Sequence, residues 1–268
     1  MRINCQLKSM KSCLFERLSA RSILNAAVAV VGAVVLTASA KATNLALNGD
    51  FEQLLVPGFS AEFGSRYPSQ QVTDWTTTGY NFVFTPGSAD TSGSLGEYGG
   101  LTLWGPNNGS SNGLPAASPS GGNFLAMDGA YAVGPVSQTI NGLTPGNGTT
   151  VSFYWAGAQQ FGYNSATTEQ FQVSLGSEVK FTPVVNNANH GFTGWQHESM
   201  SFVPTSSSEL LSFLAIGTPA GVPPFSLLDG VVVGTPEPAT WALLMASFAG
   251  IGGLALLRRR SERQNKVS

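Results

Sequence analysis

The sequence predicts an all-β domain flanked by two apolar terminal segments. Apolar and polar residues alternate in the central part of the chain, for example where Val151, Phe153 and Trp155 are separated by single polar residues. Gly, Pro, Ser, Thr and Asn recur between such runs, which is typical of turns that join short strands. No stretch of the central part has a helical period, so we expect a β-sandwich.

Residues 1–42 are predicted to form a secretory signal peptide. Basic residues up to Arg21 precede an apolar stretch from Ile23 to Leu36, and small residues follow at Ala38-Ser39-Ala40 and Ala40-Lys41-Ala42. Such a peptide implies passage through the Sec translocon and cleavage by signal peptidase. An uncleaved signal anchor is the alternative, which the shortness of the apolar stretch disfavours.

The exported domain, residues 43–234, is strongly acidic. Its basic side chains are Arg66 and Lys180, against twelve Asp and Glu residues, so its formal net charge is −10. A phosphate backbone would be repelled, which excludes nucleic acid as a partner and favours neutral or cationic ligands. Both cysteines of the chain, Cys5 and Cys13, lie in the signal peptide, so no disulfide stabilises the domain.

Several strands can be placed by their patterns. Alternation predicts strands around residues 151–155, 170–175 and 199–202. The segments 210–216 and 227–233 are more continuously apolar, which predicts central strands covered on both faces. Turns are expected at Asn141-Gly142, Pro145-Gly146 and Gly176-Ser177.

An uncharged apolar segment from Ala239 to Leu257 follows the domain. As a helix it would span about 28 Å, close to the hydrocarbon thickness of a bilayer. Pro236 and Pro238 oppose helix upstream, and Arg258, Arg259 and Arg260 provide a basic stop on the cytoplasmic side. A C-terminal helix of a soluble core is the alternative.

The step Pro236-Glu237-Pro238, the apolar segment and the arginine cluster together resemble the PEP-CTERM tail. The resemblance implies a sorting and anchoring tail over 235–262, with its helix at about 239–257 and a short cytoplasmic end at 263–268. It also implies processing by an exosortase of a Gram-negative bacterium. The protein would be anchored transiently in the inner membrane and then reach the cell surface or extracellular matrix.

The start of the domain, Asn44-Leu45-Ala46-Leu47-Asn48-Gly49-Asp50-Phe51-Glu52, resembles the first strand of galactose-binding-like jelly rolls, which include many carbohydrate-binding modules. Asp74-Trp75, Gly194-Trp195-Gln196 and the segment from Leu227 to Val231 resemble later steps of that fold. The resemblance implies a jelly-roll β-sandwich over approximately 44–234.

The same resemblance implies a structural calcium ion. Glu52 and Asp229 match the two acids that can lie beside an ion in these jelly rolls, and Asn48 or Asp50 are lesser candidates. Carboxylate and carbonyl oxygens are the ligands that Ca²⁺ prefers. The alternative is that both acids accept hydrogen bonds from backbone amides and fix strand ends.

Exposed aromatic rings are candidates for stacking on sugars. Tyr98, Trp104 and Tyr163 lie in Gly- and Asn-rich segments and are the preferred glycan-binding candidates, whereas Trp75, Trp155 and Trp195 are expected in the core. The long segments 85–100 and 105–122 are either binding loops or solvated connections.

Catalysis has little support in the sequence. His190 and His197 fit no common zinc spacing, no G-x-S-x-G nucleophile elbow occurs, and nothing selects a pair of glycosidase acids. We therefore expect a non-catalytic protein that binds a glycan, such as an exopolysaccharide of a biofilm. The alternatives are a purely structural envelope or biofilm protein without a specific ligand and, less favoured, a polysaccharide-acting hydrolase or lyase.

Overall fold

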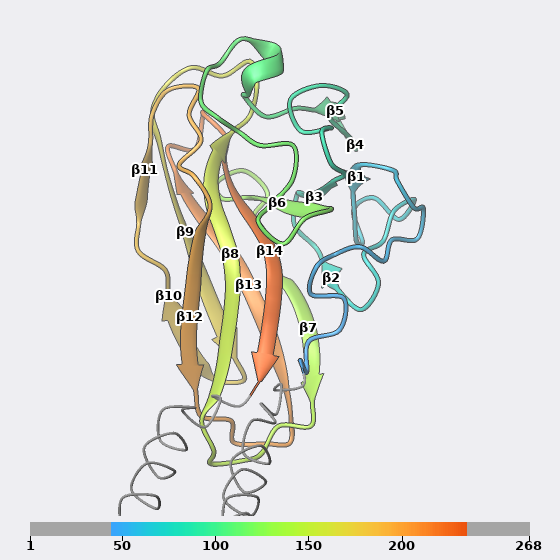
Figure 1. Ribbon diagram of the computed structural model, residues 1–268, viewed down its shortest axis with the longest axis vertical. Coiled ribbons are helices and arrows are strands. Elements are labelled where there is room, and N and C mark those ends of the chain that lie inside the picture. The colour runs from blue at the N-terminus through green and yellow to red at the C-terminus, as the bar shows by residue number, and fades with distance from the viewer. Residues whose placement is uncertain (1–43, 235–268) are drawn as a thin grey trace, which may run out of the picture. The chain divides into compact units, whose positions relative to one another are not determined.

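A computed structural model of the protein describes residues 44–234 as two β-sheets packed face to face (Figure 1). The elements in chain order are β1 (Ala61–Glu62), β2 (Thr76–Thr77), β3 (Asn81–Phe84), β4 (Ser94–Gly96), β5 (Gly99–Leu101), the 3₁₀ turn η1 (Pro106–Asn108), β6 (Phe124–Asp128), β7 (Val136–Asn141), β8 (Thr149–Gln159), β9 (Thr167–Leu175), β10 (Glu178–Phe181), β11 (Val185–Asn187), β12 (Gln196–Phe202), β13 (Ser208–Thr218) and β14 (Pro224–Gly234).

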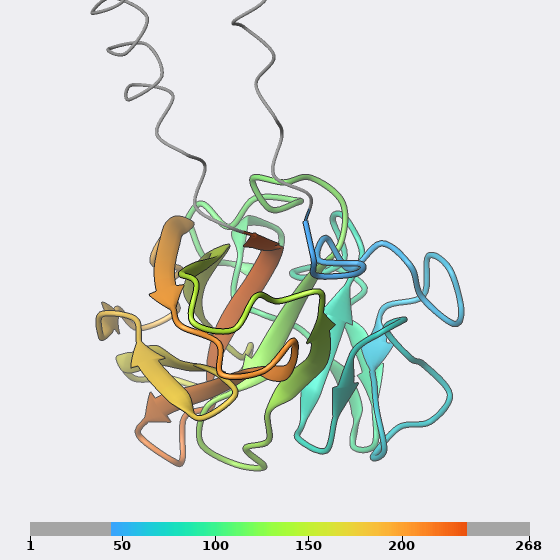
Figure 2. The same ribbon diagram turned by 90° about the horizontal axis from the view of Figure 1, so that it is seen from below.

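The larger sheet has the strand order β12-β8-β14-β6-β3-β1-β4-β5, and the smaller sheet has the order β10-β9-β13-β7-β2 with β11 also paired to β9. Every pairing is antiparallel except that of β1 with β4. Figures 1 and 2 show the short strands β1–β5 beside the long strands β8, β9, β13 and β14. From β6 onward the chain passes repeatedly from one sheet to the other, which is the connectivity of a jelly roll. The predicted all-β sandwich is confirmed.

The main core lies between the two sheets. Aromatic rings from both layers meet there, and Phe213 contacts Trp75, Phe153 and Phe171 with ring centroids 6.3, 5.1 and 6.0 Å apart. All four side chains are buried, as is Trp155. Burial of Trp75 and Trp155 agrees with the sequence prediction, whereas Trp195 is only partly buried.

A second apolar cluster covers the opposite face of the larger sheet. It includes Phe82, Phe124 and Phe225 together with Leu103 and Leu114 from the chain between β5 and β6. Strand β14 is therefore covered on both faces up to Asp229, as its continuous apolar run predicts, whereas Val232 near its end is 43% exposed. The same prediction is wrong for β13, because Leu210 is 50% and Ile216 is 36% exposed on the outer face of the smaller sheet.

The opening segment 44–52 differs from the strand expected there, because it forms turns instead. Asn48 adopts a positive φ of 47°, and its side chain bonds the backbone of Gln53 and Thr73. Gly49 lies against the carbonyl oxygen of Val231, where a Cβ would overlap it. This close approach requires glycine, and it places Phe51 in the core.

The two ends of the described segment meet. The Leu45 N–H donates to the Val233 carbonyl at 2.7 Å, and the Val233 N–H donates to the Asn44 side-chain oxygen at 2.8 Å. Within residues 44–234 the two sheets bury two apolar clusters of their own. Residues 44–234 therefore form a domain that can fold independently.

One acid is buried in the interior between the sheets. Glu169 of β9 is fully buried, and its Oε1 accepts a hydrogen bond from Thr167 while its Oε2 has no partner. Burial raises the pKa of this carboxyl group to about 7, although hydrogen bonds from Thr167 and Asn187 oppose the rise. The side chain occupies space that a Cβ on Gly157 of β8 would fill, which explains a glycine within that strand.

The predicted signal peptide, sorting motif, apolar segment and arginine cluster lie outside the described residues. Between residues 44 and 234 the chain forms no helix whose length and hydropathy would suit a bilayer span.

Candidate functional site

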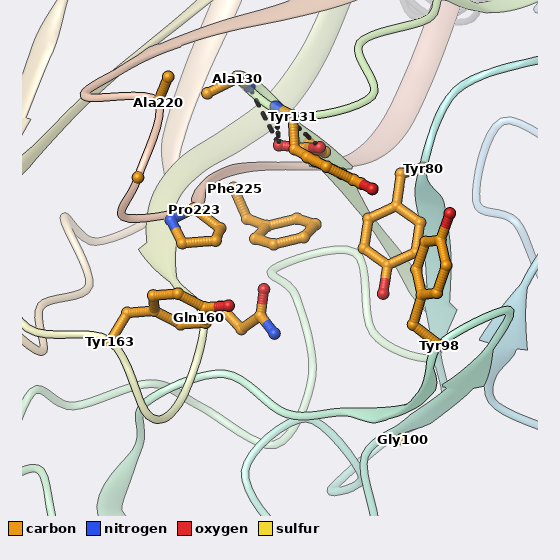
Figure 3. A pocket seen from close by; sticks show the side chains of 12 residues that line it. Tyr80, Tyr98, Gly100, Ala130, Tyr131, Gln160, Tyr163, Ala220, Pro223 and Phe225 are labelled. Carbon is orange, nitrogen blue, oxygen red and sulfur yellow. Dashed lines mark hydrogen bonds between the residues drawn. The ribbon is translucent and has the colours of Figure 1, made fainter.

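A cavity of about 470 Å³ opens beside the larger sheet, and five of its twelve lining residues are aromatic (Figure 3). Its walls come from the region around β3, β5 and β6, from the segment after β8, and from the connection between β13 and β14. The lining residues are Tyr80, Tyr98, Gly100, Asp128, Ala130, Tyr131, Gln160, Tyr163, Ala220, Gly221, Pro223 and Phe225.

Three tyrosines form one wall. The ring centroids of Tyr80 and Tyr98 are 5.8 Å apart, those of Tyr80 and Tyr131 are 6.1 Å apart, and those of Tyr98 and Tyr131 are 6.3 Å apart. Tyr98 and Tyr131 are 61% and 65% exposed, while Tyr80 is buried behind them. The wall thus presents ring surface to solvent over a rigid aromatic base.

Tyr98 is held by a charged contact at the tip of the β4–β5 hairpin. Arg66 donates to Glu97 at 2.6 Å and to the Tyr98 hydroxyl at 3.5 Å, and it also pairs with buried Glu62 at 3.3 Å. Glu62 in turn accepts the Glu97 N–H at 2.8 Å. These bonds fix the hairpin tip, so the position of Tyr98 does not depend on its own packing alone.

Tyr131 is held by a buried carboxylate. The two oxygens of Asp128, at the end of β6, accept the backbone N–H groups of Ala130, Tyr131 and Ala132 at 2.8–3.2 Å. Four such contacts occupy the carboxylate and shape the turn that carries Tyr131. Asp128 is the one carboxyl group among the residues that line this cavity.

Tyr163 and Gln160 stand across the cavity from the tyrosine wall, with Phe225 and Pro223 between them (Figure 3). The indole of Trp104 fixes this side, because its Nε1 donates to the Tyr163 carbonyl at 3.0 Å. Trp104 also stacks on His190 with ring centroids 3.7 Å apart. The Phe161 N–H anchors the same segment by donating to the Thr102 carbonyl at 2.8 Å.

Nearby acidic side chains affect the ionisation of two of the tyrosines, Tyr80 and Tyr98. Burial and the charges of Glu62 and Asp128 raise the pKa of Tyr80 to about 12. Hydrogen bonding to Tyr131 and the charge of Glu97 raise the pKa of Tyr98. The hydroxyl groups of Tyr80 and Tyr98 therefore remain able to donate hydrogen bonds at neutral and mildly basic pH.

The structure brings two of the three predicted aromatic candidates to this cavity. Tyr98 and Tyr163 line it, whereas Trp104 lies behind Tyr163 and supports it. Sequence reasoning missed Tyr80, Tyr131 and Gln160. Tyr131 could have been identified as a site residue from the sequence, because it lies in a turn with Gly and Ala directly after a strand that ends in Asp128.

Two of the four candidate calcium ligands, Glu52 and Asp229, contact the segment 118–123. Glu52 accepts the Asn123 N–H, and Asp229 accepts the Ser118 hydroxyl. Asp229 is buried with an unpartnered Oδ1, and burial raises its pKa to about 7. Asp50 is exposed and adds negative charge near Asp229, while the side chain of Asn48 is occupied by backbone contacts. Within residues 44–234, no three Asp, Glu, His or Cys side chains cluster as a metal site.

No known protein family and no curated protein sequence matches this chain. Among solved structures, it is similar to a family 61 carbohydrate-binding module in complex with β-1,4-galactotriose, with 14% identity, 72% of this chain and 99% of that chain covered, and a TM-score of 0.39. It is also similar to a family 4 carbohydrate-binding module (CBM4), with 15% identity, 71% of this chain and 99% of that chain covered, and a TM-score of 0.31. A third is the CBM22-2 xylan-binding domain of Xyn10C from Paenibacillus barcinonensis (10% identity, 66% and 99% covered, TM-score 0.34).

Proposed function

We propose that residues 44–234 form a non-catalytic glycan-binding domain and that the tyrosine-lined cavity is its binding site. The observation that carries this proposal is the pair of facing walls, with Tyr98 and Tyr131 on one side and Tyr163 with Gln160 on the other. Aromatic faces stack on the apolar faces of sugar rings, and phenol and amide groups bond the hydroxyls.

The charges around the cavity favour a neutral or amino-sugar glycan. Glu62, Glu97 and Asp128 lie at or behind the tyrosine wall, and Arg66, the one nearby cation among the described residues, is already paired with Glu62 and Glu97. Uronic acids or sulfated sugars would therefore meet uncompensated negative potential.

The cavity favours binding over hydrolysis. A glycosidase of the usual kind needs two carboxyl groups across the scissile bond. Asp128 is the single acid among the lining residues, and its oxygens are occupied by backbone N–H groups. The remaining alternative is a structural envelope protein without a specific ligand, in which the tyrosines would be merely exposed.

We also propose that the protein is exported and sorted by its two terminal segments. Export by the signal peptide, exosortase recognition at Pro236-Glu237-Pro238 and transient membrane anchoring would bring the domain to the cell surface or matrix. The polymer met there would be an exopolysaccharide. Fractionation of cells tests this part: intact, uncleaved protein in the cytosol would contradict it.

A binding assay tests the site. Purified residues 44–234 are screened against neutral, amino-sugar and uronic-acid oligosaccharides, and the best ligand is titrated by calorimetry. Tyr98→Ala and Tyr163→Ala should each weaken binding by about 5- to 30-fold, since loss of an aromatic contact costs about 1–2 kcal/mol. Tyr67→Ala, outside the cavity, is the matched control. Retained affinity in both cavity variants refutes the site, and release of reducing sugar refutes the non-catalytic assignment.

We also propose that Asp229 and Glu52 hold a structural Ca²⁺. The buried, unpartnered Oδ1 of Asp229 supports this, because such an atom is costly without a partner. Calcium should raise the thermal midpoint of residues 44–234, and Asp229→Asn should abolish the rise. An unchanged midpoint of the parent domain over a calcium titration removes the proposal.

A further inference from the structure

The outer face of the smaller sheet carries no charged side chain along β2, β7, β9, β10 and β13. The residues that point outward there are Ser, Thr, Gln and Asn together with apolar side chains, and the printed pairings place them on one face. Leu210, Ile216 and Phe181 are exposed on it, with Phe181 at 52%. A domain with a formal net charge of −10 thus keeps one broad face free of charge.

We propose that this neutral face, defined as the outward residues of these five strands, docks a second copy of the chain face to face. Two copies of so acidic a domain repel one another in most orientations. Contact through the neutral face keeps the carboxylates of both copies at the rim, where solvent and salt screen them. The same contact buries Leu210, Ile216 and Phe181, which are otherwise left in water.

The size of the neutral face suits a modest dimer. The five strands together hold 32 residues. At about 3.3 Å per residue and about 4.8 Å between strands they cover roughly 500 Å² per copy, or about 1,000 Å² in total, which is at the lower limit of specific interfaces. Side-by-side pairing of sheet edges is disfavoured, because the edge strand β10 carries the ion pair of Lys180 and Glu178 at 3.0 Å.

The neutral face is also complementary to itself. One row crosses the whole sheet in register through Val179, Ser174, Ser212, Ser137 and Thr76. Exposed Val179 stands at one end of this row, and a hollow of about 400 Å³ lined by Ser137 and Thr76 lies at the other. A two-fold axis parallel to the strands would bring Val179 of each copy over the hollow of the other, as an isologous contact requires.

Sedimentation velocity of residues 44–234 tests the proposal over a range of protein and salt concentrations. We expect a monomer–dimer equilibrium whose association constant increases from about 0.05 to 0.5 M NaCl, because salt screens the repulsion and leaves the apolar contact intact. The double variant Leu210→Glu/Ile216→Glu should lower the association constant by more than about tenfold, since it places like charges opposite one another.

Leu55→Glu is the matched control, because Leu55 is 59% exposed on a loop outside the neutral face. Val179→Asp provides a second face variant at the sheet edge, in case the double variant unfolds; circular dichroism and the thermal midpoint verify folding of each protein. Loss of dimer in folded face variants but not in Leu55→Glu supports the proposal. A parent domain that stays monomeric up to about 1 mM at high salt, or equal weakening by Leu55→Glu, overturns it.

Discussion

Replacing Glu169 with glutamine removes the one carboxyl group that the structure buries between Thr167, Asn187 and Gly157. Burial raises its pKa from an ordinary value of 4.5 to about 7, so the folded domain binds a proton that the unfolded chain has already released. Below pH 4.5 Glu169 is protonated in both the folded and the unfolded state, so its ionisation does not reduce the free energy of unfolding. Between pH 4.5 and 7 the stability falls, and above pH 7 the loss is complete.

The magnitude follows from the two pKa values. Moving from 4.5 to about 7 corresponds to about 3 kcal/mol less stability at pH 8 than at pH 4 from this group alone. Glutamine keeps the shape of the side chain and an oxygen for Thr167 but cannot ionise. The Glu169→Gln domain should therefore gain stability relative to the parent as pH rises, with a thermal midpoint about 6–12 °C higher than that of the parent at pH 8.

Urea unfolding of both proteins at intervals from pH 4 to pH 8 measures this difference, and taking the difference cancels the other titrating groups. Glu198→Gln is the control, because Glu198 is only half-buried on β12 and accepts a bond from its neighbour Ser199. A difference between parent and Glu169→Gln that stays constant across this range would refute the reasoning.

Three further predictions follow from the same structure. Phe213→Ala should cost about 3–5 kcal/mol, because the ring contacts three other aromatic side chains in the main core, and a fall of roughly 10 °C in thermal midpoint would register it. Gly49→Ala should destabilise by about 1–3 kcal/mol through overlap with the Val231 carbonyl; an unchanged urea midpoint would show that the backbone can shift. Trp104→Ala should leave the fold intact but lower glycan affinity by about fivefold, since the bond to the Tyr163 carbonyl is lost; calorimetry with unaltered affinity would assign Trp104 a purely structural role.

The pattern of single strands allowed much of the sandwich to be predicted. Alternation at Val151, Phe153 and Trp155 identified the inner face of β8, because a strand that is covered on one face alternates with period two. The error at β13 has a physical cause. Leu210 and Ile216 are apolar but lie on a face that nothing covers in the described domain. Hydrophobicity alone therefore could not predict that their side chains are exposed.

The candidate site was only partly predictable. Exposed tyrosines in Gly-rich segments identified Tyr98 and Tyr163, but the cavity combines segments near residues 80, 98, 130, 160 and 223. Their convergence depends on the order of strands in the larger sheet, which no local pattern encodes. Local pattern was insufficient for the opening segment as well. Asn48-Gly49 is part of the motif that resembles jelly rolls, but the turn that it forms depends on contacts with the distant residues Thr73 and Val231.

Strand β14 joins the cavity to the place where the described chain ends. Phe225, near its first residue, lines the cavity, and Val233, near its last, pairs with Leu45 (Figure 1). An eleven-residue strand is about 35 Å long, so the cavity lies roughly one strand length from Gly234. Under the proposed anchoring through the chain after Gly234, a polymer too bulky to reach the membrane surface would still reach the cavity, which is separated from that surface by about the length of β14.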